Sequence, residues 1–158
     1  MAATIEFLKK RDAANFSRLA RGVIAATDYY SKTAKRHEAA NYRAEKVVEK
    51  LLGRKYLHLC AKLEGKMVGF CDGYFDLGIF WVDWIGVEKG FRRKGIATRM
   101  LKFLEKKLKR GKAHKIWFDS RISNRESIGL FKKLGYRKIA FLRNHWYGQD
   151  FYLWEKFI

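Results

Sequence analysis

The 158-residue chain contains no proline and only two cysteines, Cys60 and Cys71. Two cysteines cannot build a disulfide framework, and they lie in no Cys/His spacing typical of a zinc site. We therefore expect both to be reduced core residues of an intracellular protein, and we expect no metal. Because no proline, Gly/Ser-rich tract or repeat marks a linker, we expect one domain over residues 1–158.

Long apolar runs are also missing. The first residues, MAATIEFLKKRDAA, contain no apolar segment typical of a secretory signal. No run approaches the roughly 20 apolar residues that span a bilayer. We therefore expect a soluble, cytoplasmic protein without a membrane partner.

Acidic residues are few compared with basic ones. Sixteen Asp and Glu stand against 35 Lys and Arg, which gives a formal net charge of +19 and implies an anionic partner. Residues 80–158 carry 20 basic and 7 acidic side chains, against 15 and 9 in residues 1–79, so the anion is expected to bind the second half. Apolar residues make up 48% of the chain, which favours a packed core over disorder.

Hydrophobic periodicity predicts an α/β fold of the α+β type. Strands are predicted at residues 3–8, 56–63, 67–75, 79–87, 115–122, 137–143 and 151–157. Helices are predicted at residues 11–31, 36–52, 95–110 and 125–134. This order predicts a mixed sheet of six to seven strands flanked by about four helices. Gly86, inside a predicted strand, indicates a bulge or a close approach by another backbone.

The segment IGVEKGFRRKGIAT, residues 85–98, joins a strand end to a basic turn and a helix start. Free N–H groups at a helix start bind phosphate oxygens, and the small Gly95 and Ala97 let a bulky pyrophosphate approach. The segment lacks the Lys-Ser/Thr pair of a Walker loop, and the chain has no G-x-G-x-x-G, which excludes nucleotide hydrolysis and Rossmann binding. An ordinary basic strand-to-helix turn is the alternative.

Two linked motifs carry a family resemblance. Residues 92–97 resemble the Gln/Arg-x-x-Gly-x-Gly/Ala signature of the GNAT superfamily of acetyl-CoA-dependent N-acetyltransferases. Residues 119–124 (DSRISN) and 130–136 (LFKKLGY) resemble the Asn-containing loop and the helix of the second half of that signature. Residues 117–124 and 143–144 look most like the ribosomal-protein alanine N-acetyltransferases and their archaeal N-terminal acetyltransferase relatives.

This resemblance implies a GNAT fold and an enzyme that transfers the acetyl group of acetyl-CoA directly to a primary amine, a protein N-terminal α-amine or a lysine. It implies that the backbone of Ile85 and Val87 pairs with pantetheine, and that Asn124 hydrogen-bonds to the same arm. The implied cofactor-binding residues are Ile85, Val87, Arg92, Arg93, Lys94, Gly95, Ile96, Ala97, Thr98, Asn124, Ser127 and Phe131.

Catalytic roles follow from the same resemblance. Asp119 stands where the subgroup has a glutamate general base, and its shorter side chain favours proton transfer through water; an ion pair with Arg121 or a lysine is the alternative. Phe131 replaces the tyrosine that usually protonates the leaving thiolate. We hypothesise that Tyr147 donates that proton instead, with Tyr136 as a less favoured substitute.

The acceptor is not named by the sequence. Trp81, His145 and Trp146 are expected to line its groove, although Trp81 also fits simple packing. The positive field leads to the hypothesis of an acidic peptide or a nucleic-acid-associated protein as acceptor, whereas a small polyamine would call for an acidic groove. A small-amine acetyltransferase and a basic nucleic-acid-binding module stay open as alternatives, and oligomeric state is unreadable.

Overall fold

The computed structural model describes residues 2–111 and 113–158. Within these residues lie seven strands and five α-helices. The strands are β1 (Thr4–Phe7), β2 (Tyr56–Leu63), β3 (Lys66–Asp76), β4 (Ile79–Val87), β5 (Lys115–Arg121), β6 (Arg137–Leu142) and β7 (Phe151–Phe157). The helices are α1 (Ala13–Ala25), α2 (Lys32–Asn41), α3 (Ala44–Leu52), α4 (Ile96–Leu108) and α5 (Arg125–Lys133), with 3-10 turns η1 (Lys10–Asp12), η2 (Lys89–Phe91) and η3 (Trp146–Gly148).

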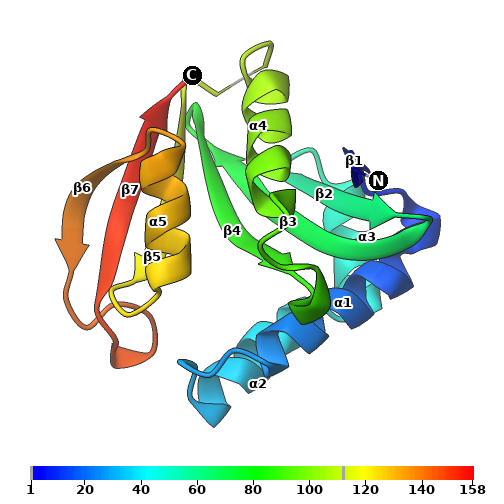
Figure 1. Cartoon of the computed structure of the whole chain (residues 1–158), viewed down its shortest axis with the longest axis horizontal. Helices are drawn as coiled ribbons and strands as arrows, with labels where there is room; N and C mark the ends of the chain where they lie inside the picture. Colours follow the sequence, from blue (N-terminus) through cyan, green and yellow to red (C-terminus); the bar gives the residue numbers. More distant parts are fainter. Residues whose placement is uncertain (1, 112) are drawn as a thin grey trace.

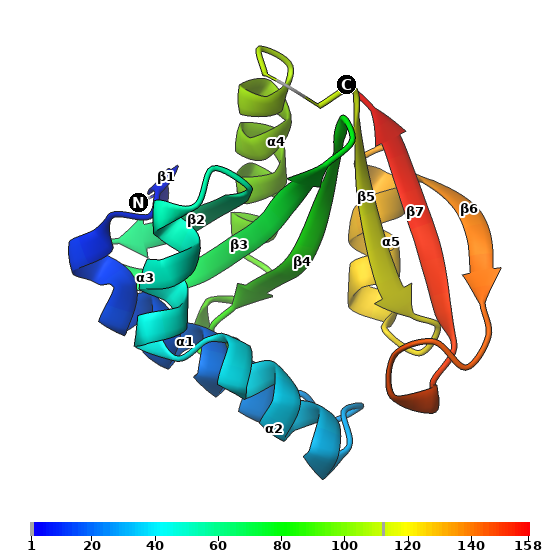
Figure 2. The same cartoon turned by 180° about the vertical axis from the view of Figure 1, so that it is seen from behind.

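The strands form one mixed sheet in the order β1-β2-β3-β4-β5-β7-β6 (Figure 1). Neighbours run antiparallel except β4 and β5, which are parallel because α4 connects them as a crossover. The α4 and α5 helices lie on one face, whereas α1, α2 and α3 lie on the other (Figures 1 and 2). This arrangement confirms the predicted α/β class and mixed sheet.

Each face of the sheet has its own apolar core. Met100, Leu101 and Leu104 of α4 are fully buried against one face, and Phe16 and Ile24 of α1 are fully buried against the other. The two cysteines are buried and free, which confirms their predicted core positions. No helix of the described residues is both long and apolar enough to cross a bilayer.

Two predicted helices differ from the structure: the one predicted at residues 11–31 ends at Ala25, and the one predicted at residues 36–52 is divided. Residues 36–52 form two helices, because α2 ends at Asn41 and α3 begins at Ala44. Tyr42 gives the reason: its side chain is 2% exposed, and its hydroxyl donates to Asp72 Oδ1 at 2.8 Å. Arg43 then takes an extended backbone with ψ of 145°. The burial of Tyr42 therefore overrides the periodicity that the two helices share.

Gly86 marks a close approach, but not the approach by another backbone that its position in a strand predicted. A Cβ at this position would lie 2.5 Å from a ring carbon of Phe70, so side chains rather than another backbone approach it. The bulge lies elsewhere on β4. The pairing of β3 with β4 shifts between Asp72 and Gly73 and leaves Asp83 without an opposite residue.

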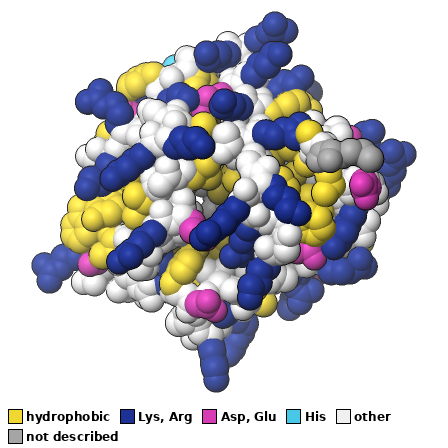
Figure 3. Space-filling model, in the orientation of Figure 1, with side chains coloured by type: hydrophobic (Ala, Val, Ile, Leu, Met, Phe, Trp, Pro, Cys, Tyr) yellow, Lys and Arg dark blue, Asp and Glu magenta, His cyan; other side chains and the backbone are white. Residues whose placement is uncertain are grey.

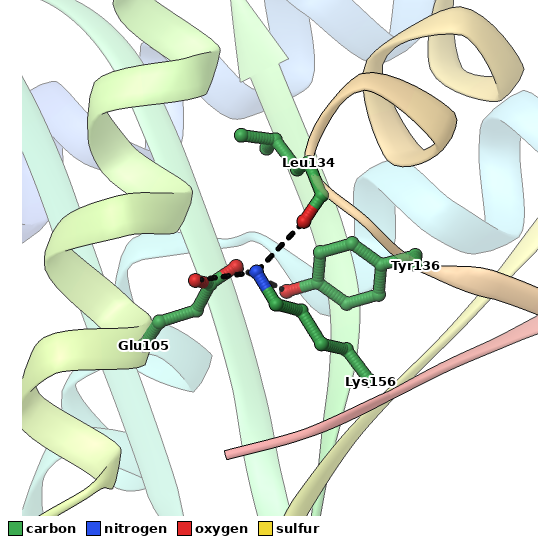
Figure 4. Close-up of polar contacts among 4 residues, drawn as sticks. All are labelled: Glu105, Leu134, Tyr136 and Lys156. Carbon is green, nitrogen blue, oxygen red and sulfur yellow. Dashed lines mark hydrogen bonds and ion pairs between the residues drawn. The ribbon is translucent and has the colours of Figure 1, made fainter.

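A polar contact ties α4 to the far half of the sheet (Figure 4). Lys156 Nζ of β7 lies 2.8 Å from Glu105 Oε2 of α4 and donates to the carbonyl oxygen of Leu134 at 2.7 Å. The Tyr136 hydroxyl donates to Glu105 Oε1 at 3.1 Å. Because only 12% of the Glu105 side chain is exposed, this carboxylate satisfies two donors where water has little access.

Replacing Glu105 by alanine should lower the free energy of unfolding by about 2–4 kcal/mol, because Lys156 loses its ion-pair partner and the Tyr136 hydroxyl loses its acceptor in a partly buried place. Glu49→Ala is the matched control, since its pair with Lys46 is exposed and should contribute at most about 1 kcal/mol. Urea unfolding at neutral pH measures both. Equal losses in the two variants would contradict the structural role of Glu105.

A second polar cluster is buried beneath α3. Asp72 is 1% exposed, and its Oδ2 lies 3.8 Å from Nε2 of His58, which is 3% exposed. Burial raises the pKa of Asp72 to about 8 and lowers the pKa of His58 to about 4. Both groups are therefore mainly neutral at pH 7, and their proximity is not an ion pair.

Asp72→Asn should become progressively more stable than the wild type as pH rises from about 5 to 8. The folded pKa of Asp72, about 8, lies far above the unfolded value near 4. Its favourable contribution is therefore complete below the unfolded pKa and is lost as pH rises through the folded pKa. Asparagine still accepts the Tyr42 hydrogen bond but does not ionise. Thermal melts between pH 5 and 9 test this, and a difference independent of pH would contradict it.

Candidate active site

The β4 and β5 strands pair only over their first residues. Their parallel register ends with Val82 beside Phe118, after which the strands diverge (Figures 1 and 2). The β4 strand continues to Val87 and β5 to Arg121. Within the described chain, the last residues of β4 therefore pair with β3 alone. The other edge of β4, at Ile85 and Val87, borders an opening between the strands.

This opening holds a cleft of about 640 Å³, a size typical of small-molecule sites. Its walls come from the end of α1 and the loop after it, from β4, from the segment leading into α4 and from the first turn of α5. Ten of the twelve expected cofactor-binding residues line it: Ile85, Val87, Arg92, Arg93, Gly95, Ile96, Ala97, Thr98, Asn124 and Ser127.

The α4 helix begins at the wall of this cleft. Its N-cap, Gly95, has φ of 73°, in the left-handed region that glycine adopts without a steric penalty. The first bond of the helix runs from Arg99 N to Gly95 O. The N–H groups of residues 96–98 have no acceptor within the helix, and all three residues line the cleft. With the positive end of the helix dipole, these N–H groups suit phosphate oxygens.

The basic side chains before α4 differ in placement. Arg92 and Arg93 line the cleft, and Arg92 Nε donates to the carbonyl oxygen of Val87 at 3.1 Å. Lys94 does not line the cleft; its Nζ lies 5.2 Å from the ring centroid of Phe91. The cofactor contact expected of Lys94 therefore stays a prediction, whereas Arg92 and Arg93 lie in the wall of the cleft.

Asn124 joins α5 to the loop after α1. Its Oδ1 accepts from Ser127 N at 3.1 Å and so caps α5, and its Nδ2 donates to the Tyr29 hydroxyl at 2.8 Å. Tyr29 also lines the cleft. A ligand arm that binds Asn124 must therefore share or replace the Tyr29 contact.

The ring of Phe131 lies in the core rather than in the cleft. It is 2% exposed, and its centroid lies 4.4 Å from that of Phe118 and 5.8 Å from that of Trp154. The expectation that it lines the thioester pocket is corrected, because the apolar core below α5 holds it away. Tyr136 is likewise held, at 4% exposure, with its hydroxyl donating to Glu105, so it does not face the cleft.

Asp119 lies on the opposite face of β5 from Phe118, since side chains alternate along a strand. Its Oδ2 accepts from Trp146 Nε1 at 2.7 Å and lies 3.5 Å from His145 Nε2. Neither Arg121 nor a lysine pairs with it among the described residues. Burial raises the pKa of Asp119, while the bond from Trp146 and the proximity of His145 oppose that shift.

Tyr147 follows Trp146 in the η3 turn and has a left-handed backbone with φ of 56°. Its hydroxyl donates to Glu38 Oε1 at 2.8 Å. Desolvation and this carboxylate raise the pKa of Tyr147 to about 12, so the phenol keeps its proton throughout the neutral range.

Trp81 lies on the same face of the sheet as Asp119. It pairs with Trp117 of β5 in the parallel register, and their rings meet edge to face with centroids 4.8 Å apart. His145 packs 4.6 Å from Trp146, centroid to centroid. Trp81, Trp117, Asp119, His145 and Trp146 therefore lie on one side of the sheet, where the acceptor groove is expected; this surface is called the acceptor face below.

Glu38, Trp84 and Arg121 were not among the site residues predicted from the sequence. Glu38 joins Tyr147 to Trp84, whose Nε1 donates to Glu38 Oε2 at 3.1 Å. Arg121 is 2% exposed and donates to the carbonyl oxygen of Tyr29. No local pattern marks these residues, because each contact joins segments distant in the sequence.

Proteins with a similar sequence are named as N-acetyltransferases. An N-alpha-acetyltransferase of Saccharolobus solfataricus is 38% identical over 71 residues, which are 44% of this chain and only 42% of that protein. The ribosomal protein bS18-alanine N-acetyltransferase of Escherichia coli is 26% identical over 103 residues, covering 65% of this chain and 70% of that protein.

A solved structure shares the whole fold. The PaiA N-acetyltransferase of Thermoplasma acidophilum, in complex with coenzyme A, superimposes with a TM-score of 0.85 at 18% identity and covers 100% of both chains. The model of the Acetyltransferase (GNAT) family matches residues 23–136, which include the cleft, the start of α4 and Asp119. The chain therefore belongs to the GNAT family of acetyltransferases.

Proposed function

We propose that this N-acetyltransferase transfers the acetyl group of acetyl-CoA to the α-amine of a protein N-terminus. The family membership makes it an acetyl-CoA-dependent enzyme. The names of two relatives, an N-alpha-acetyltransferase and a ribosomal protein alanine N-acetyltransferase, support the choice of a protein α-amine. The observation that carries the proposal is the position of the carboxylate of Asp119, held by Trp146 beside the diverging strands.

The residues of the cleft fit acetyl-CoA. The free N–H groups of residues 96–98 and the guanidinium groups of Arg92 and Arg93 would hold the pyrophosphate. The edge of β4 at Ile85 and Val87 has no strand partner and offers main-chain groups to the amides of the pantetheine arm, with the Val87 carbonyl oxygen exchanging its bond from Arg92. When bound, the thioester would supply an activated acetyl carbon to the acceptor amine.

Transfer forms a C–N bond to the acceptor amine and breaks the C–S bond of the thioester. The proton that leaves the nitrogen goes to Asp119, directly or through a water molecule. An α-amine has a pKa near 8, against about 10.4 for lysine, so it needs less help to reach its reactive neutral form. A single partly buried carboxylate therefore matches an α-amine better than a lysine.

The leaving thiolate accepts a proton to give the free thiol. Tyr147 is the proposed donor, because its raised pKa keeps the phenol protonated and because Phe131 supplies no hydroxyl. In the structure this hydroxyl is bound to Glu38, so donation requires that bond to exchange. A thiol pKa near 8.5 makes the thiolate a fair leaving group, so proton donation by Tyr147 needs to contribute little to the rate.

Three carboxylates lie on or beside the acceptor face, those of Glu38, Asp83 and Asp119, despite the net charge of +19. Desolvation raises the pKa of Asp83 to about 6, with the charges of Glu38 and Asp119 adding to the shift and those of Lys50 and Lys55 opposing it. Such a field repels an acidic peptide. In place of the acidic acceptor hypothesised from the overall charge, we propose one whose first residues are uncharged or basic.

The excess of basic side chains is not explained by the cofactor alone. On the face shown in Figure 3, Lys and Arg are spread widely and form no single stripe of the kind that follows a nucleic-acid backbone. Catalysis rather than nucleic-acid binding is therefore the proposed role. One domain over residues 1–158 and a cytoplasmic location stay predictions, supported by the full-length structural match and the free cysteines.

Incubation with acetyl-CoA and a peptide pool, followed by mass mapping, tests this function. The pool contains peptides with free N-termini and acidic, neutral or basic first residues, N-terminally blocked lysine peptides, and a small diamine. We expect acetylation of α-nitrogen, with acidic peptides the poorest acceptors. Modification of lysine side chains or of the diamine alone would overturn the proposed acceptor, and no product of any kind would overturn the catalytic assignment.

A further inference from the structure

Glu38 of α2 connects three separate elements through one carboxylate. Its Oε1 accepts from the Tyr147 hydroxyl of η3 at 2.8 Å, and its Oε2 accepts from Trp84 Nε1 of β4 at 3.1 Å. These partners are 109 and 46 residues away in the chain. The α2 helix and the loop between β6 and β7 lie at the same end of the molecule (Figure 2).

Both partners belong to the proposed site. Trp84 lines the cofactor cleft directly before Ile85. Tyr147 is adjacent in sequence to Trp146, which holds Asp119. The ring of Tyr30 lies 5.5 Å from Trp84 and 6.4 Å from Tyr147, centroid to centroid, and so fills the space between them. Glu38 therefore lies where the cofactor cleft meets the acceptor face.

Glu38 differs from the other partly buried carboxylates in its partners. Five of them form ion pairs with lysines: Glu6, Asp12, Glu88, Glu105 and Glu155. Within the described chain Glu38 pairs with no Lys or Arg, although the sequence contains 35 of them. Both of its oxygens serve neutral donors from the site instead. These two hydrogen bonds fix the orientation of the Trp84 and Tyr147 side chains relative to each other, because each donor binds a different oxygen of the same carboxylate.

We propose that Glu38 is a positioning residue of the acetyltransferase, which holds Trp84 and Tyr147 so that the acceptor amine is aligned with Asp119. The inference rests on the proposed function and adds to it a residue that touches neither cofactor nor reacting atoms. Small misplacements of reacting groups are costly in rate, since a shift of about 1 Å can cost on the order of 100-fold. Its loss should therefore affect the acceptor step more than acetyl-CoA binding.

Kinetics of Glu38→Ala and Glu38→Gln with a peptide acceptor test this role. We expect kcat/KM for the peptide to fall about 10- to 100-fold in Glu38→Ala and less in Glu38→Gln, which keeps one acceptor oxygen. Acetyl-CoA affinity should stay within about 3-fold. The acid limb of the pH profile should move to lower pH in both variants, because the Glu38 charge contributes to the raised pKa of Asp119. Glu45→Gln, an exposed charge loss on α3, is the control.

Two further measurements keep the inference separate from the proposed function. Tyr147→Phe should lower kcat/KM less in Glu38→Ala than in the wild type, because the bond between the two side chains is already lost and only proton donation remains to be removed. Hydrogen exchange over residues 144–149, which needs no acceptor, should accelerate in Glu38→Ala and remain unchanged in β5. Unchanged exchange, additive losses, or an equal loss of acetyl-CoA binding would overturn the role of Glu38. If the wild type acetylates no peptide but hydrogen exchange still accelerates in Glu38→Ala, the proposed acceptor is overturned, whereas the role of Glu38 in holding Tyr147 is not.

Discussion

Ala97→Asp is expected to weaken acetyl-CoA binding by at least about 100-fold while leaving the fold intact. Ala97 lies in the first turn of α4 and lines the cleft. An aspartate there favours the helix, because negative charge complements the positive end of its dipole. The same carboxylate about 4 Å from a phosphate costs on the order of 4 kcal/mol before salt screening, at an effective dielectric constant of about 20. Equilibrium dialysis with labelled acetyl-CoA measures the loss.

Ala44→Asp is the matched control for this substitution. Ala44 is the first residue of α3, outside the residues that line the cleft, so the same change should preserve both folding and acetyl-CoA binding. Circular dichroism melts of both variants report helix content and stability. Wild-type affinity in Ala97→Asp would show that the start of α4 does not bind the pyrophosphate, and a comparable loss in Ala44→Asp would point to a general charge effect.

Asp119→Asn is expected to lower kcat/KM for a peptide acceptor by about 100-fold near neutral pH, within the range typical of general acid–base catalysis. Asparagine keeps an oxygen for the Trp146 hydrogen bond, so the local geometry should persist. The loss should be greatest at low pH and should narrow as pH passes the α-amine pKa near 8, because the acceptor then arrives without its extra proton. Initial rates from pH 5.5 to 9.5 measure the profile.

Two controls define this result. Acetyl-CoA affinity should be unchanged in Asp119→Asn, because Asp119 is not among the residues that line the cofactor cleft. Asp76→Asn, an exposed carboxylate loss at the end of β3, should leave the profile as in the wild type. Equal turnover of Asp119→Asn and wild type at every pH would remove Asp119 from the mechanism.

Most of the fold could be predicted from the sequence, because apolar spacing follows the period of each element. The seven strands lie where alternation or β-branched runs placed them. The break between α2 and α3 could not be predicted, because it depends on the burial of Tyr42 against Asp72, 30 residues away in the chain. Local periodicity carries no information about such a partner.

In the candidate site too, residues that are contiguous in the sequence could be predicted, whereas residues brought together only by folding could not. The residues before and within the first turn of α4 are contiguous, so their composition and their family resemblance placed them at the cleft. Phe131 departed from that expectation, because the direction of a side chain depends on packing rather than on motif position. Glu38 was missed because its two partners come from β4 and η3, which only the folded chain brings together.

A crystal structure with bound coenzyme A tests the central claim most directly. We expect pyrophosphate oxygens within hydrogen-bond distance, about 3 Å, of the N–H groups of residues 96–98. We also expect the pantetheine arm along the edge of β4 at Ile85 and Val87, with its sulfur directed to the side of Asp119. A coenzyme that binds elsewhere, or whose phosphates leave those three N–H groups without contact, would show that the start of α4 is not the pyrophosphate site.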